Sequence, residues 1–179
     1  MVFATYCAKN RLKPSNKLKM LIDFNQLAST ARIWLYTCST LLSSEQKKII
    51  EEKFSHFIQT WESHGNPLKG SIEILHNHFI VIGVDETFNS ISGCAIDKSV
   101  ELIRELEKEL NITLLNHTQI SYQIQDTIHI DSLLNVKQKI QEGIIKTNTL
   151  IFNPTISQKA DLQSSWIIPA EKSWLVKYF

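Results

Sequence analysis

The order in which strand-like and helix-like patterns follow one another is the strongest constraint on how this chain can fold. Residues 31–38 alternate, with Ile33 and Leu35 facing one side and Trp34 and Tyr36 the other. This alternation is typical of a strand with two different faces. The chain is therefore expected to begin its folded part with a strand.

Two later segments have the spacing of amphipathic helices. The first has Ser43 and Ser44 as N-terminal caps, apolar residues at helical spacing up to Trp61, and Gly65 as a stop. The second runs from about 94 to 110 and carries charged residues on its other face. Its predicted buried stripe consists of Ile96, Val100, Ile103 and Leu106.

Between these helices, the stretch 70–84 is rich in Ile, Val and Phe and is interrupted at Asn77, which predicts strands at 71–76 and 78–84. Residues 119–130 alternate again as one or two strands. The C-terminal part is expected to hold a helix at 132–142 ended by Gly143, a strand at 148–152 and a helix after Pro154. This order predicts an α+β fold of the ferredoxin-like split βαβ type (βαββαβ), an antiparallel sheet with helices on one face, followed by a C-terminal helical and aromatic extension.

A chain of 179 residues can bury a sizeable core and suits one domain. The first nineteen residues hold five basic residues and no acid, so we expect a basic, disordered extension at 1–19 and a single α+β domain at 20–179. Met20 is an alternative start to Met1. The rest of the chain has 18 acidic and 14 basic residues, which argues against a nucleic-acid-binding groove.

The three cysteines, Cys7, Cys38 and Cys94, have no paired spacing, so neither a disulfide framework nor a cysteine zinc site is indicated. Free thiols fit a reducing compartment, and the predicted location is cytoplasmic. No apolar run approaches the ~20 residues needed to cross a membrane. The apolar run from Trp166 to Phe179 is expected to fold back onto the domain or to be buried in a homodimer.

Several short motifs point to a known family. They are Ala-Arg-Ile-Trp-Leu-Tyr at 31–36, Trp-Glu-Ser-His-Gly at 61–65, Ser-Gly-Cys-Ala-Ile-Asp at 92–97, Leu-Ile-Phe-Asn at 150–153 and Trp-Ile-Ile-Pro at 166–169. In their order and spacing, the chain from about residue 24 onward resembles a family of short bacterial proteins of unknown function that are commonly labelled "ABC transporter ATPase". The resemblance implies no activity. The five glycines form no Gly-rich turn ending in Gly-Lys-Ser/Thr, so ATP hydrolysis by a P-loop is not expected.

The Ser92-Gly93-Cys94 turn leads directly into the second predicted helix. Because the positive end of a helix dipole favours a thiolate, Cys94 is a candidate nucleophile or redox sensor, with His64 as its base. The alternative is a small buried thiol chosen for packing. In that case Gly93 would be required by a positive φ or a close backbone approach.

The same helix end is a candidate anion site, in which exposed N–H groups, Ser92 and Lys69 would hold a small anion or phosphate. Alternatively, Ser92 and Asp97 simply cap the helix. Arg32 is a further candidate for ligand binding. The alternative for Arg32 is an ion pair with Asp85 across the sheet.

Histidines suggest a third kind of site. His76 and His78 flank Asn77, and His129 and Asp131 repeat that spacing, so a three-ligand metal site can be drawn from them. A histidine pair on a ferredoxin-like sheet is also similar to single-strand-nicking transposases, which have a bulky apolar residue between the histidines and a tyrosine on a later helix. In this chain Asn77 lies between the histidines and the helix at 94–110 has no tyrosine, so nicking is not expected. A bound metal and a cofactor are not expected either.

The sequence thus predicts a non-enzymatic binding or interaction module for a small anionic ligand or a protein partner, with a homodimer as one arrangement. Its ligand-binding residues are expected to be Ser92, Gly93, Asp97, Lys69 and Arg32, near Cys94 and His64. The alternative is a thiol-dependent enzyme or redox sensor that uses Cys94, with His64 as base and Ser92 and backbone N–H groups as oxyanion donors.

Overall fold

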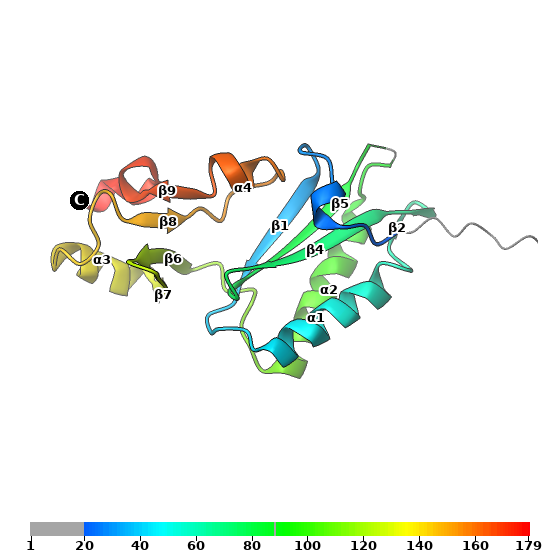
Figure 1. The fold of residues 1–179 in the computed structure, drawn as a ribbon, viewed down its shortest axis with the longest axis horizontal. Helices are drawn as coiled ribbons and strands as arrows, with labels where there is room; N and C mark the ends of the chain where they lie inside the picture. Colours follow the sequence, from blue (N-terminus) through cyan, green and yellow to red (C-terminus); the bar gives the residue numbers. More distant parts are fainter. Residues whose placement is uncertain (1–19, 88) are drawn as a thin grey trace, which may run out of the picture.

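The structure is a computed structural model that describes residues 20–87 and 89–179. The basic extension expected at 1–19 lies outside the described residues. Within them, the chain is an α+β protein with four α-helices and three antiparallel sheets. Figure 1 shows two halves along the long axis, the first holding α1 and α2 and the second holding α3 and α4.

The first half is a three-stranded sheet covered by two helices. Its strands are β1 (Arg32–Thr37), β5 (Phe79–Asp85) and β4 (Lys69–Leu75), in the order β1-β5-β4. The helices α1 (Ser44–Phe57) and α2 (Gly93–Leu110) pack on the same face of this sheet (Figure 1). The buried side chains between them include Tyr36, Ile50, Phe54, Ile58, Ile80, Ile82, Val84, Leu102, Ile103 and Leu106.

Local signals set the limits of α1. The hydroxyl of Ser43 accepts a hydrogen bond from the N–H of Gln46 at 3.1 Å, and the Gln46 side chain accepts one from the N–H of Ser43 at 2.9 Å. This capping box satisfies two N–H groups that the helix leaves free. The helix ends at Phe57, earlier than predicted, and Gly65 lies in the turn of a later hairpin.

The helix α2 has the predicted length but buries a different stripe. Ile96 and Val100, which were expected in the core, are only partly buried. The small residues Ala95 and Ser99 take the buried positions on the first two turns, so the helix axis can lie close to the sheet. The buried stripe consists of Ala95, Ser99, Leu102, Ile103 and Leu106.

The second half is a four-stranded sheet in the order β7-β6-β8-β9. Its strands are β6 (Gln119–Ile124), β7 (Thr127–Ser132), β8 (Leu150–Phe152) and β9 (Ile167–Pro169), and α3 (Leu133–Gln141) packs on it. The helix expected after Pro154 is the four-residue α4 (Asp161–Ser164). Three 3₁₀ helices complete the described chain, η1 (Phe24–Gln26), η2 (Ala170–Lys172) and η3 (Trp174–Tyr178).

An apolar cluster joins the two halves. Phe79, on the face of β5 that points away from the helices, stacks on Phe152 of β8 with ring centroids 4.7 Å apart. Trp166 packs edge-on against both rings and is buried, so this part of the aromatic run folds back as predicted. Trp174 and Phe179, in contrast, remain 44% and 45% exposed.

The ferredoxin-like strand order is not evident. The segment expected to supply the fourth strand, now β6, pairs with β7 and β8. It does not pair with β1, so β1 is an edge strand of a three-stranded sheet. The alternating pattern of β6 marked a strand correctly, but it carried no information about which sheet the strand joins.

Candidate functional site

A short hairpin packs against the N-terminal end of α2. It consists of β2 (Glu62–Ser63) and β3 (Asn66–Pro67), which pair antiparallel. Just before it, the indole Nε1 of the buried Trp61 donates a hydrogen bond of 2.8 Å to the carbonyl oxygen of Ala95. The Trp-Glu-Ser-His-Gly motif at 61–65 therefore fixes this hairpin to the first turn of α2.

Serine hydroxyls order the backbone at the same end. Ser63 Oγ donates to the carbonyl oxygen of Ser90 at 2.8 Å and accepts from the N–H of Ser92 at 2.9 Å. Ser92 is the N-cap of α2, and its Oγ accepts from the N–H of Ala95 at 3.3 Å. The predicted cap at Ser92 is confirmed. Asp97 lies exposed in the second turn and takes no part in capping.

Cys94 is exposed at the second position of α2, so the interpretation of a buried packing thiol is wrong. The prediction that Gly93 is required by a positive φ or a close backbone approach is also wrong. Its φ is not positive, and an added Cβ would meet no atom within 4 Å. Nothing in the structure requires glycine at this position. The helix end thus presents an accessible thiol beside free backbone N–H groups.

His64 lies exposed in the turn of the β2–β3 hairpin, with φ at 52°. No described residue forms a hydrogen bond with its ring or with the sulfur of Cys94. The thiol–imidazole pair that a cysteine enzyme would use is therefore not assembled in this structure. The two residues share only the same end of α2.

Lys69 begins β4 and Arg32 begins β1. Lys69 lies opposite Asp85 in the β4–β5 register, and hydrogen bonds from Thr87, helped by the charge of Lys69, lower the pKa of Asp85. The guanidinium of Arg32 lies over the ring of Trp34, 5.0 Å from its centroid. Among the described residues, no ion pair joins Arg32 to Asp85, so that predicted pair is wrong.

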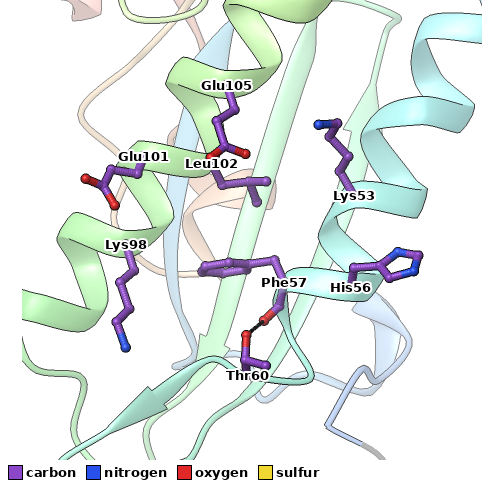
Figure 2. A pocket seen from close by; sticks show the side chains of 8 residues that line it. All are labelled: Lys53, His56, Phe57, Thr60, Lys98, Glu101, Leu102 and Glu105. Carbon is purple, nitrogen blue, oxygen red and sulfur yellow. Dashed lines mark hydrogen bonds between the residues drawn. The ribbon is translucent and has the colours of Figure 1, made fainter.

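A groove with a volume of about 570 Å³ runs between α1 and α2 (Figure 2). Phe57 and Leu102 give it an apolar base, and Thr60 closes the end where its hydroxyl donates to the carbonyl oxygen of Phe57 at 3.2 Å. Polar and charged side chains line both walls. They are Lys53 and His56 from α1, and Lys98, Glu101 and Glu105 from α2.

The exposed thiol lies on the same side of α2 as this groove. Positions 94, 98, 101 and 105 recur at the spacing of one helix face, so Cys94 is one turn before Lys98. The residues that line the groove do not include Ser92, Gly93, Cys94, Asp97 or His64. The residues predicted at the helix end therefore lie beside the groove and not in it.

The sequence did not reveal this groove, because it depends on which faces of two distant helices meet. The charged positions of α2 were recognised as its exposed face, but their partners on α1 were not. Helical spacing alone places residues on a face. It does not say which neighbouring helix lies beside that face.

A polar cluster in the second half was also missed. Tyr122 Oη donates to Asp131 Oδ2 at 2.6 Å, and Lys139 Nζ donates to both the Tyr122 and Asp131 oxygens at 2.7 Å. Burial and the hydrogen bond to Asp131 raise the pKa of Tyr122. Burial opposes ionisation of Asp131, but hydrogen bonds from Lys139 and Tyr122 outweigh it and lower the pKa of Asp131. Because Lys139 belongs to α3, Tyr122 to β6 and Asp131 to β7, these hydrogen bonds fix α3 on the sheet.

The histidines that could be drawn together as metal ligands have different surroundings. His78 is buried and its Nδ1 contacts the carbonyl oxygen of Cys38 at 2.9 Å, whereas His76 is exposed in the hairpin turn beside Trp166. His129 stacks on Tyr122 in the other half. Within residues 20–87 and 89–179, no three His, Cys, Asp or Glu side chains are grouped as metal ligands.

Two further results bear on function. No described helix combines the length and the apolar character that a membrane span requires. The chain matches no protein-family model, no curated protein and no solved structure.

Proposed function

We propose that this protein is a non-enzymatic binding module for a protein partner, and that the groove between α1 and α2 is its binding surface. The observation that carries the proposal is the composition of the groove, an apolar base of Phe57 and Leu102 between two charged walls. A partner segment with one apolar side chain flanked by charges of both signs would be complementary to it.

A small anion fits this surface less well. Glu101 and Glu105 line the same wall as Lys98, and their carboxylates would repel an anion that approached its amine. At the N-terminal end of α2, the hydroxyl of Ser92 is already engaged by the N–H of Ala95. The two carboxylates in the groove and the engaged hydroxyl of Ser92 both favour the protein partner over the small anionic ligand.

The proposal is tested by exchanging charges within the groove. The variant Lys98→Glu/Glu101→Lys keeps the net charge but reverses two exposed wall positions. The matched control Glu142→Lys/Lys146→Glu makes the same exchange at exposed positions beyond α3. Binding partners are identified by quantitative affinity capture from the native host. We expect a partner that wild type and control retain equally and that the groove variant loses at least about tenfold. Equal capture by all three proteins would contradict the proposal.

A second candidate function uses Cys94, and its exposure at the start of α2 is the observation that favours it. The thiol is accessible and lies beside the groove, so it would act there as a redox-sensitive group or a nucleophile. The test is the pH dependence of alkylation in a Cys7→Ser/Cys38→Ser background. An apparent thiol pKa below about 7 supports this function, and a value near the ordinary ~8.5 contradicts it.

We also propose that the first half is related in fold to ferredoxin-like proteins. What supports this proposal is the order β1-β5-β4, in which the last of the three strands in sequence lies between the other two, as in the split βαβ arrangement. The fourth strand of that arrangement would pair with the outer edge of β1. The cytoplasmic location, the homodimer and membership of the family labelled "ABC transporter ATPase" stay predictions.

A further inference from the structure

The outer edge of β1 is only partly paired. The N–H of Ile33 donates to the carbonyl oxygen of Ser157 at 2.9 Å, and the N–H of Lys159 donates to the carbonyl oxygen of Ala31 at 2.9 Å. Residues 157–159 therefore begin to pair antiparallel with β1. The preceding residues leave the edge, because Thr155 donates its N–H to the side chain of Asn153 in a turn.

Backbone groups further along this edge have no partner. In an antiparallel ladder, alternate residues direct both N–H and C=O to the same side. Since Ile33 points outward to Ser157, Leu35 and Thr37 also point outward. Among the described residues, no hydrogen bond reaches the N–H of Leu35 or Thr37 from that side.

A cavity of about 520 Å³ runs along the same edge. All six residues of β1 line it, together with Val100, residues 114–117, Pro154, Ile156 and Ser157. Arg32 is its fixed cation, and no Asp or Glu is among the lining residues. The side-chain oxygen of Gln119, another lining residue, is buried without a hydrogen-bond partner. The cavity therefore combines a row of free backbone groups with an unopposed positive charge.

We infer that this edge of β1 binds an extended, acidic peptide segment of a partner protein by strand addition. The segment would lie opposite 34–37, in the place that a fourth strand would occupy. Backbone hydrogen bonds to Leu35 and Thr37 would hold it. An acidic side chain opposite Trp34 would face the Arg32 guanidinium, which lies over that ring. This inference goes beyond the binding function proposed for the α1–α2 groove and uses none of the groove residues.

The test uses the full chain labelled with ¹⁵N and three blocked peptides. The first is Ac-Val-Glu-Val-Glu-Val-NH₂, the second is the same peptide with N-methylated backbone amides, and the third has Lys in place of Glu. We expect the Leu35 and Thr37 amide resonances to shift in a saturable way with the first peptide. Binding should weaken at least about tenfold for the N-methylated and Lys peptides.

The variant Arg32→Glu reverses the charge on the protein, as the Lys peptide reverses the charge on the peptide. Arg32 is exposed, so this change should leave the fold intact. The variant should prefer the Lys peptide to the Glu peptide.

Protection of the Leu35 and Thr37 amides in the free protein would show that the chain itself or a second copy already covers the edge, and would overturn the inference. Shifts confined to α1 and α2 would overturn it too and would instead support the groove.

Discussion

The indole of Trp61 and the carbonyl of Ala95 are joined by a buried hydrogen bond of 2.8 Å, although the two residues lie 34 positions apart. This bond links the segment after α1 to the first turn of α2, and Trp61 also packs against Phe57 at the base of the groove with ring centroids 5.1 Å apart. The spacing between the two helices, and hence the shape of the groove, depends on this contact.

The variant Trp61→Phe should therefore destabilise the protein by about 1–3 kcal/mol, because a buried carbonyl loses its donor and a smaller ring leaves a gap. The free energy of unfolding in urea measures the loss. Trp34→Phe is the control, since that indole is only half-buried and has no hydrogen bond among the described residues. Equal losses in both variants would contradict the role given to the Trp61–Ala95 bond.

The Asp131–Lys139 pair predicts a pH-dependent coupling. The lowered pKa of Asp131 adds stability above the unfolded value near 3.9, and this stability is lost as pH falls through the lower folded pKa. The raised pKa of Lys139, caused by Asp131 and Tyr122, adds stability below about 10.4 that is lost as pH rises further. A double-mutant cycle of Asp131→Asn and Lys139→Met should give about 1 kcal/mol near pH 7 and nothing at either extreme.

The control for this cycle is the Lys48–Glu52 pair on α1. Its atoms are 3.8 Å apart and its side chains are 76% and 61% exposed, so solvent screens their attraction. The coupling there should be close to zero at every pH. If the Asp131–Lys139 coupling is equally small, the polar cluster does not fix α3 on the sheet.

Two glycines should respond in opposite ways to substitution by alanine. A Cβ at Gly70 would lie 2.7 Å from Ile58 Cδ1 and 3.2 Å from the backbone oxygen of Gly83, so Gly70→Ala should cost about 1–3 kcal/mol. A Cβ at Gly93 would meet no atom within 4 Å, and alanine favours a helix. Gly93→Ala should therefore be neutral or stabilise by up to about 1 kcal/mol. Thermal unfolding of both variants separates these outcomes, and a large loss at Gly93 would reveal a constraint that the geometry does not contain.

Features encoded locally could be predicted from the sequence. The alternation of Ile33 and Trp34 placed them on opposite faces of β1, and the interruption at Asn77 marked a turn in which Asn77 has φ at 55°. Ser92 was recognised as a cap because its hydroxyl acts within three residues. Each of these features depends on neighbours a few positions away, and short-range geometry determines them.

Features that depend on distant contacts could not be predicted in this way. The face of α2 that enters the core follows from its contacts with the sheet and with Trp61, which favour the small Ala95 over Ile96. The exposure of Cys94 also follows from which face of α2 enters the core, because Cys94 lies outside that face. The sheet that β6 joins depends on strand pairing across the chain, because an alternating pattern suits any sheet with one buried face.

Tyr36 connects this packing to a measurable titration. Burial raises its pKa to about 12, although a hydrogen bond with Ser99 of α2 acts in the opposite direction. A tyrosine in an unfolded chain ionises near pH 10, so the buried neutral side chain contributes stability that is complete below about pH 10. This contribution is lost as the pH rises from about 10 to about 12.

The free energy of unfolding of wild type should thus fall more steeply across this range than that of Tyr36→Phe, whose ring cannot ionise. Ultraviolet absorbance of tyrosinate should show one group fewer titrating near pH 12 in the variant. Parallel stability curves for the two proteins would mean that Tyr36 is accessible to solvent and that α2 does not seal this face of the sheet.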